Sequence, residues 1–387
     1  MTLLTNARIV LLDGVRAAGW IRLDGARIAR VGAAGSPPEP SPTDPHEDVV
    51  DLHGRYLLPG FVDMHVHGGG GAAFSSGNVG QSLTAAAFHR THGTTTIIAS
   101  MVSTELSVLE RYLSDLAGLV EDGLVAGLHL EGPFISKARC GAHDPAALRA
   151  PDPVVLRRLL AAGRGTVKMV TLAPELEHGI EATHLLANSG VIAAVGHTDG
   201  QYETAAEAFA AGAKVATHLY NAMPGVHHRY PGPVTAAIED ENVIIEMVND
   251  GVHVHPAVVG MTFNAVGAHR LALITDAMAA AGGPDGAYRL GSLDVEVSGG
   301  VARLAGGGSI AGSTLTMDVA LRRTVRELGI PLDEAAVSAS LTPARALGLD
   351  SEIGSIETGK YADLVVLDDD LEVKGVMKRG AWSVPLR

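Results

Sequence analysis

The sequence predicts an α/β fold: a TIM-like (β/α)8 barrel with a small β-sandwich domain built from both chain termini. Two observations favour it. Eight runs of apolar residues, rich in β-branched side chains, recur through the middle of the chain and alternate with Ala-rich stretches of helical spacing. Both ends of the chain show short alternating strands separated by Gly or Asp turns. Because such strands need partners, we expect the two ends to form one domain.

The terminal domain is expected to comprise residues 1–57 and 356–387. Its N-terminal strands are predicted in LLTNARIVLLDG, GWIRLDGARIARVG and DVVDLHGRYLLPG, and its C-terminal strands in GSIETGKYADLVVLDDDLEVKGVMKRG. The segment from Ser36 to Glu47 is rich in Pro and acidic residues, which indicates a surface loop.

The barrel is expected to comprise residues 58–355. Its predicted strands, in chain order, are PGFVDMHVH, TTTIIAS, LVAGLHLEG, VKMVTLAPE, VIAAVGHT, KVATHLYN, VIIEMVNDGVH and LALITDAM. An open doubly wound sheet is the alternative, but eight runs within this length favour closure. The Gly-rich run GGGGAAFSSG after His67 does not stand between a strand and an immediate helix, so it does not favour a nucleotide site.

Composition excludes several classes of protein. The 387 residues are 47% apolar and 19% charged, which excludes a disordered chain. With 29 Lys and Arg against 43 Asp and Glu, the formal charge is -14, so nucleic acid and anionic membranes are poor partners. No uninterrupted apolar stretch approaches ~18 residues, so we expect no membrane span. The single cysteine, Cys140, excludes a disulfide framework and fits a reducing compartment. Arg8 and Asp13 also interrupt the apolar region that a signal peptide would need, so we expect a cytoplasmic protein.

Polar residues gather at the C-terminal ends of the predicted strands, which is where (β/α)8 barrels carry their active sites. They are His65 and His67, Glu131, His197, His218, His253 and Asp276. A single histidine in such a position is more often structural than functional. A set of six or seven on successive strands instead indicates a functional site.

The residue types in this set favour a divalent metal ion. His65 and His67 are two residues apart on a strand, so their side chains point the same way and can reach one ion. A second group of ligands comes from Glu131, His197 and His218. Imidazole and carboxylate groups suit zinc, iron and similar ions, and the carboxylate of Asp276 beside a bound ion is a ready general base. The alternative is a polar barrel mouth that binds no metal.

The motifs carried by these strands resemble the amidohydrolase superfamily and, within it, the family of N-acetylglucosamine-6-phosphate deacetylases. The specific motifs are HLEGPF (129–134), THLYNAMP (217–224), DGVHV and the late AGSTLTM (311–317). Two less specific motifs, LPGFVDMHVHG and TPARALGL…GSIETGKYADLVVLD, extend the resemblance to essentially the full length.

This resemblance implies metal-dependent hydrolysis of N-acetyl-D-glucosamine 6-phosphate to D-glucosamine 6-phosphate and acetate, in amino-sugar metabolism, by a homodimer. It implies a core metal site made of Glu131, His197 and His218, with Asp276 as catalytic acid and base. His143 is expected to polarise the acetyl carbonyl. Because His65 and His67 are kept, we expect one or two ions per subunit, the second bridged through Glu131. Asp276 is also expected to be a metal ligand. Zinc is the expected ion, with iron, cobalt and manganese as alternatives.

The resemblance also implies a phosphosugar site. Its residues are Ala142, His143, Asn221, Ala222, Arg229, Asp250, His253, Ile310, Ala311 and Gly312. Arg229 and His253 match the positions that hold the phosphate, often from the neighbouring subunit of a dimer. Arginine suits this role because its planar fork matches phosphate oxygens.

Two other functions stay open at this point. One is a different amidohydrolase reaction, such as opening of a cyclic amide or cleavage of a dipeptide; the other is a non-catalytic barrel. Other amidohydrolases bridge their ions with a lysine at the end of the fourth strand, but Lys168 lies at the start of that strand here. The resemblance therefore assigns the bridging role to Glu131. The metal, the hexosamine epimer and the role of Cys140 also stay open.

Overall fold

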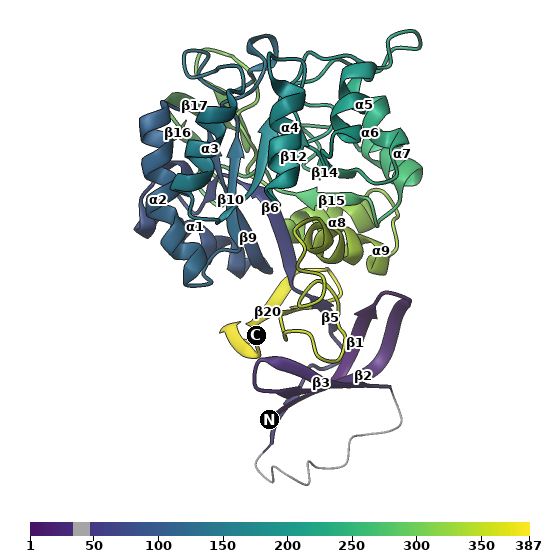
Figure 1. Ribbon diagram of the computed structural model, residues 1–387. Coiled ribbons are helices and arrows are strands. Elements are labelled where there is room, and N and C mark those ends of the chain that lie inside the picture. The colour runs from purple at the N-terminus through teal and green to yellow at the C-terminus, as the bar shows by residue number, and fades with distance from the viewer. Residues whose placement is uncertain (34–46) are drawn as a thin grey trace. The chain divides into compact units, whose positions relative to one another are not determined.

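The computed structural model describes residues 1–33 and 47–387, so the loop predicted from Ser36 lies outside the described residues except for Glu47. Contacts divide the chain into two compact units (Figure 1). The first comprises Met1–Asp63, His89–Thr96 and Met317–Arg387, and the second comprises Met64–Phe88 and Ile97–Thr316. None of the described helices is long and apolar enough to cross a membrane.

The eight predicted strands of the middle region form one sheet. In spatial order they are β6 (Phe61–Val66), β9 (Thr94–Val102), β10 (Gly127–Glu131), β11 (Val167–Leu172), β12 (Ile192–Val195), β13 (Val215–Ala216), β14 (Ile244–Val248) and β15 (Leu271–Ile274). The segment after β15 returns to β6, because the Asp276 N–H donates to the His65 carbonyl (2.9 Å) and the His67 N–H donates to the Ala277 carbonyl (2.8 Å). The predicted (β/α)8 barrel is confirmed.

Burial explains why these runs form barrel strands. Every residue of β9 and of β10 is buried, as expected for parallel strands that are covered on both faces. The surrounding helices are α1 (Val79–Thr91), α2 (Leu106–Glu121), α3 (Pro153–Ala162), α4 (Gly179–Asn188), α5 (Tyr202–Ala210), α6 (Gly232–Glu239) and α7 (Pro256–Val266) (Figure 1). The start of α3 is fixed by Asp152, whose carboxylate accepts the Val154 N–H at 2.7 Å, with Pro153 as the first helical residue.

A small antiparallel sheet follows the last barrel strand and was not predicted. It consists of β16 (Gly286–Leu290), β17 (Leu293–Ser298) and β18 (Val301–Leu304). Burial alternates along β17, and its inward residues Val295 and Val297 pack in one cluster with Met278 and Ala311. This packing fixes the loop around Ala311 close to the end of the barrel.

The remaining elements are short or belong to the first unit. They are β7 (Gly68–Gly69), β8 (Ala72–Ala73), the 3-10 turns η1 (Phe74–Ser76) and η2 (Lys137–Arg139), and α8 (Met317–Arg326), α9 (Leu332–Ala336), η3 (Val337–Leu341) and α10 (Thr342–Ala346).

The strands from both chain ends form one eight-stranded sheet. Its order is β21 (Ala381–Val384), β20 (Val373–Lys378), β19 (Leu364–Leu367), β5 (Tyr56–Pro59), β1 (Thr2–Leu11), β2 (Gly14–Asp24) and β3 (Arg27–Gly32), with β4 (Asp48–Asp51) paired to β1. The antiparallel pairing of β19 with β5 joins the C-terminal strands to the N-terminal ones. The predicted β-domain of both termini is confirmed, whereas its bounds at 57 and 356 stay a prediction.

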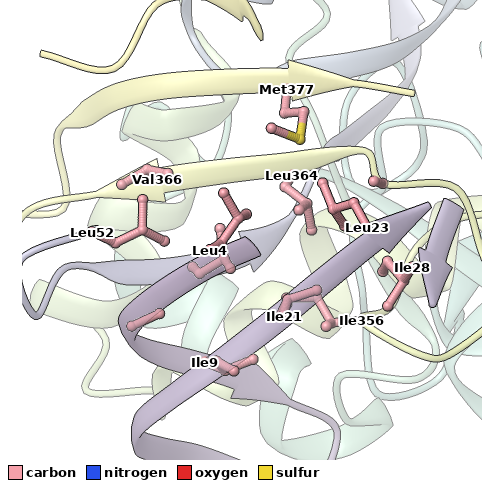
Figure 2. Packing of buried hydrophobic residues seen from close by; sticks show 13 residues of the cluster. Leu4, Ile9, Ile21, Leu23, Ile28, Leu52, Ile356, Leu364, Val366 and Met377 are labelled. Carbon is pink, nitrogen blue, oxygen red and sulfur yellow. The ribbon is translucent and has the colours of Figure 1, made fainter. Parts of the chain in front are cut away.

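One apolar cluster holds this terminal sheet together. Leu364 and Met377, from the C-terminal strands, face Leu4 and Ile21 from the N-terminal strands, and all four are at most 1% exposed (Figure 2). The cluster therefore depends on side chains that lie more than 300 residues apart in the sequence.

We expect Leu364→Ala to destabilise this domain, because it leaves a cavity in a fully buried cluster and such changes cost about 2–5 kcal/mol. Val49→Ala is the control, since Val49 is 60% exposed on β4. Thermal unfolding followed by circular dichroism should show a melting temperature below that of the unmodified protein for Leu364→Ala but not for Val49→Ala. Equal melting temperatures for both variants would contradict the role given to the cluster.

Candidate metal centre and its pocket

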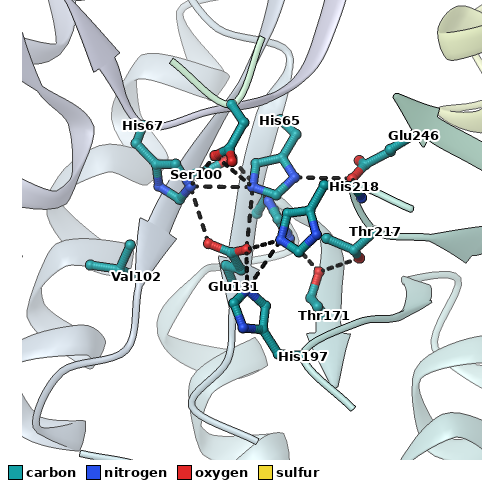
Figure 3. A network of polar contacts seen from close by, with 12 residues as sticks. His65, His67, Ser100, Val102, Glu131, Thr171, His197, Thr217, His218 and Glu246 are labelled. Atoms are coloured by element: carbon teal, nitrogen blue, oxygen red, sulfur yellow. Dashed lines mark hydrogen bonds and ion pairs between the residues drawn. The ribbon is translucent and has the colours of Figure 1, made fainter. Parts of the chain in front are cut away.

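The polar residues predicted at the strand ends lie together inside the rim of the barrel (Figure 3). They are His65 and His67 at the end of β6, Glu131 at the end of β10, and His197, His218 and Asp276 just past β12, β13 and β15. Each is buried, with at most 7% of its surface exposed. Side chains from five strands thus converge on one small volume.

The first group of potential ligands is formed by Glu131, His197 and His218. The Glu131 Oε1 atom lies 3.0 Å from Nε2 of each histidine, and the two Nε2 atoms are 3.1 Å apart. His197 Nδ1 donates to the Arg139 carbonyl at 2.8 Å, so its Nε2 carries a lone pair directed at this point. Imidazole nitrogens and carboxylate oxygens are atoms that commonly bind zinc in proteins.

The second group is formed by His65, His67 and Asp276. The His67 Nε2 atom lies 3.2 Å from both Asp276 Oδ1 and His65 Nε2, and His65 Nε2 lies 3.6 Å from the same Oδ1. His65 Nδ1 is 3.0 Å from the carboxylate of Glu246, which leaves Nε2 to face the group. The two histidines predicted to share an ion therefore lie together with Asp276.

Glu131 connects the two groups. Its Oε1 atom faces the first group, while its Oε2 atom lies 3.1 Å from His67 Nε2. Both groups are compact enough to hold a metal ion each. Ligand atoms about 2.0–2.1 Å from a tetrahedral zinc ion are roughly 3.3–3.4 Å from one another. The observed separations are close to this value, so the donor set fits a divalent ion, and Glu131 can bridge two.

The charges of the carboxylates dominate the electrostatics of the centre. Burial alone would lower the pKa of His67, but hydrogen bonds to Asp276 and Glu131 outweigh it and raise the pKa to about 9. The pKa of His65 is likewise raised well above its usual value, because Glu246 and Glu131 outweigh its burial. In turn, His67 and His65 hold the pKa of Asp276 well below its usual range despite burial. The centre therefore attracts positive charge.

His143 approaches the centre from a loop after η2. Its Nδ1 accepts the backbone N–H of Ser103 at 3.2 Å, so the proton sits on Nε2, which donates to Glu131 Oε2 at 3.2 Å. Burial, only partly offset by Glu131, lowers the pKa of His143 to about 4. The imidazole is thus a neutral donor directed into the site.

His253 and Asp250 form a pair past the end of β14. The Asp250 carboxylate accepts from His253 Nδ1 at 2.6 Å and from the His253 backbone N–H at 2.8 Å. Burial alone would lower the pKa of His253, but the hydrogen bond to Asp250 outweighs it and raises the pKa. The other ring nitrogen, Nε2, lies 3.8 Å from Asp276 Oδ2. Asp250 therefore orients the imidazole of His253 toward the centre.

A pocket of about 390 Å³ opens above the two groups. Of the predicted substrate residues, those that line it are Ala142, His143, Asn221, Ala222, His253, Ile310 and Gly312. Ala311 is instead fully buried in the cluster beneath the small antiparallel sheet, and Asp250 acts behind His253. Arg229 is exposed in the loop after β13 and is not among the described residues that line the pocket.

The loop that carries Ile310 and Gly312 is fixed to Asp276. The Ser313 N–H donates to the Asp276 carbonyl at 2.7 Å, and Gly312 has a φ of +65°. A Cβ atom on Gly312 would lie 2.9 Å from the Asp276 carbonyl oxygen, so this close approach requires glycine. One wall of the pocket is thereby tied to the metal centre.

Sequence analysis missed several residues that shape the site. Ala138, Arg139, Gly141, Leu290 and Ser309 also line the pocket, and their only signal is that most of them neighbour predicted residues. Ser103 and Glu246 orient His143 and His65. Glu246 carried a usable signal, since a charged residue inside the apolar run VIIEMV needs a buried partner.

Comparisons with known proteins agree with this geometry. Residues 56–382 match the model of the amidohydrolase family. Among curated relatives, the N-acetylglucosamine-6-phosphate deacetylase of Vibrio furnissii is 35% identical, over 87% of this chain and 84% of the relative. The N-acetylgalactosamine-6-phosphate deacetylase of Escherichia coli O157:H7 is 36% identical, over 98% of this chain and 99% of the relative.

Solved structures give the same picture. A variant of the N-acetyl-D-glucosamine-6-phosphate deacetylase from Mycobacterium smegmatis, in complex with N-acetyl-D-glucosamine-6-phosphate, superimposes with a TM-score of 0.94 at 46% identity, covering 99% of both chains. The N-acetylglucosamine-6-phosphate deacetylase from Thermotoga maritima superimposes with a TM-score of 0.88 at 31% identity, covering 98% of this chain and 99% of that one.

We expect Glu131→Gln to lower metal content at both groups, because it places an amide donor where the two groups share an anionic oxygen. The measurement is the zinc content per chain, determined by elemental analysis after the protein has been loaded with zinc and passed through gel filtration. Glu296→Gln, an exposed change on β17, is the control. Retention of full metal content by Glu131→Gln would show that the ions are held by other residues.

Proposed function

The chain belongs to the amidohydrolase family, and on that basis we propose that it hydrolyses the acetamide of N-acetyl-D-glucosamine 6-phosphate to D-glucosamine 6-phosphate and acetate. The observation that carries the proposal is the pair of ligand groups that share Glu131 at the floor of a pocket. Relatives with this activity in their names align with nearly the whole chain. The direct test is release of acetate from the phosphorylated sugar by the metal-loaded protein.

The two groups are proposed to hold one divalent ion each, with zinc as the ion that the histidine and carboxylate donors suit best. When bound, such an ion polarises a carbonyl oxygen and makes a neighbouring water molecule a better nucleophile at neutral pH. Iron, cobalt and manganese are the alternatives, because they accept the same donor set. Loading with each metal in turn, followed by the acetate assay, distinguishes them.

Asp276 is proposed to move the proton. Its carboxylate is held in the ionised form by His67 and His65, so it can accept a proton from the attacking water molecule. The same proton then goes to the sugar nitrogen as the carbon–nitrogen bond breaks, which releases the amine and acetate. Its carboxylate belongs to the second ligand group and also lines the pocket, which supports this role.

His143 is proposed to stabilise the negative charge that develops on the acetyl oxygen. Its ring is neutral, Ser103 fixes its orientation, and its Nε2–H, which donates to Glu131 Oε2, is directed into the site. A preorganised donor of this kind costs no reorganisation during the reaction, and removing one typically costs roughly 3–4 kcal/mol of transition-state stabilisation.

The sugar phosphate is proposed to bind in the pocket above these groups. Asn221, His253 and the loop with Ile310 and Gly312 supply polar and apolar surface that lines it. Arg229 lies in an exposed loop, so we propose that it contacts the phosphate bound to a neighbouring subunit of a homodimer. A cytoplasmic location, expected from the single cysteine, stays a prediction.

A second substrate is supported by a specific observation. The relative from Escherichia coli O157:H7 is named for N-acetylgalactosamine 6-phosphate and aligns with 98% of this chain. Comparing kcat/KM for the two epimers decides which of them is the better substrate.

We expect Asp276→Asn to lower kcat by several orders of magnitude, because an amide fills the same space but cannot take the proton. The acetate assay with matched metal content measures this. Asp294→Asn, an exposed change on β17, is the control. Turnover close to that of the unmodified protein would remove Asp276 from the mechanism.

We expect Arg229→Ala to reduce kcat/KM for the 6-phosphate by about 10- to 150-fold, the equivalent of one charge-assisted hydrogen bond. Metal content should not change, and turnover of unphosphorylated N-acetylglucosamine should hardly respond. Arg289→Ala, another exposed arginine, is the control. If both sugars lose activity by the same factor, the phosphate is bound elsewhere.

A further inference from the structure

Glu246 is a carboxylate buried in the interior of the barrel, in the middle of the apolar strand β14. It is 0% exposed, as are its neighbours on the strand, Ile245 and Met247. Burying a carboxylate is costly unless donors or opposite charges face it, whereas an apolar side chain would fill the same space at no such cost. The contacts of Glu246 must therefore explain why it stands there.

One oxygen of Glu246 makes both of its hydrogen bonds. The Oε2 atom accepts from His65 Nδ1 at 3.0 Å and from the backbone N–H of His218 at 3.2 Å (Figure 3). His65 belongs to the group with Asp276, and His218 belongs to the group with His197. A single buried oxygen thus contacts one member of each ligand group.

Each of these bonds constrains a ligand. The bond to His65 places the proton on Nδ1, so that the lone pair of Nε2 faces the centre. The bond to His218 holds the backbone at a residue whose φ is +28°, a conformation that L-residues rarely adopt. Because the direction of a side chain follows from its backbone, this bond also aims the imidazole of His218.

We propose that Glu246 is the positioning residue that fixes the two ligand groups relative to each other, through the two hydrogen bonds that its Oε2 atom accepts. The proposal rests on the proposed function only in taking both groups as metal sites. Its consequence is that Glu246 strengthens the binding of both ions without being a ligand of either.

Because one oxygen of Glu246 makes no hydrogen bond, substitutions can test its charge and its hydrogen bonds separately. Within the described part of the chain, Oε1 has no hydrogen-bond partner. Glutamine can therefore keep both bonds with its carbonyl oxygen while its amide nitrogen replaces Oε1, which removes the charge but neither of the two bonds. Aspartate keeps the charge but is one methylene shorter, so that it cannot reach both donors.

The experiment titrates the metal-free full-length chain with Zn²⁺ against a competing chelator, for the unmodified protein and three variants. Glu246→Gln should bind two ions with affinities within about threefold of the unmodified protein. Glu246→Asp should weaken both ions by roughly 10- to 100-fold, the usual effect of losing a residue that orients a ligand. Met247→Leu, a buried change at the neighbouring residue, should bind both ions normally. Circular dichroism reports folding of each variant.

Several results would overturn the proposal. They are normal affinity of Glu246→Asp, loss of affinity in Glu246→Gln, weakening of only one ion in Glu246→Asp, or a single ion in the unmodified protein. If the Asp variant does not fold, loss of affinity in the Gln variant still overturns the proposal. The proposed function is tested separately, because two-ion binding without release of acetate by the unmodified protein would reject the deacetylase activity and leave the role of Glu246 standing.

Discussion

The carboxylate of Glu131 is buried at the end of β10 with its two oxygens facing imidazoles from four other segments of the chain. A buried carboxylate is stable only where positive charge or donors replace the water it has lost, and several kcal/mol depend on that replacement. The strands that supply these imidazoles must therefore end at the same height of the barrel. This constraint fixes their register. The carboxylates of Glu131 and Asp276 outweigh burial and raise the pKa of His67 to about 9, and the same negative charge favours a divalent ion at this point.

The backbone bends sharply where ligands follow a strand. His197, His218 and Asp276 have φ values of +48°, +28° and +49°, which turn each side chain inward just after its strand has ended. Close packing holds these turns in place: a Cβ atom on Gly196 would lie 2.6 Å from Thr217 Cβ, so β12 and β13 could not approach each other with any larger residue there. The packing of the barrel thus stabilises the unfavourable backbone conformation of these three residues, as expected for a functional site.

Much of this arrangement could be predicted from the sequence because its signals are local. Apolar runs predict the barrel strands, and a polar residue at the end of such a run, as at Glu131 or Asp276, lies at the rim by geometry alone. Partners that depend on tertiary contacts could not be predicted in this way. Ser103 orients His143 through a backbone N–H, and the sheet β16–β18 brings Leu290 to the pocket from an insertion with no periodic signal of its own. Arg229 was assigned to the phosphate by resemblance, yet it is exposed and does not line the pocket, so the phosphate contact proposed for it requires a neighbouring subunit.

The candidate metal ligands and the walls of the pocket come from different parts of the fold. Ligands stand at strand ends, whereas the pocket walls come from loops such as those with Leu290, Ser309 and Asn221. Loops generally tolerate substitutions. The strand ends that face Glu131 tolerate fewer, because their side chains must meet its carboxylate. Relatives named for the gluco and the galacto epimer are accordingly almost equally similar to this chain, at 35% and 36% identity. Overall identity therefore carries no information about the epimer, which differs only in the orientation of one hydroxyl. If the sugar binds in the pocket as proposed, the loop side chains that line it are the ones that can distinguish the two epimers.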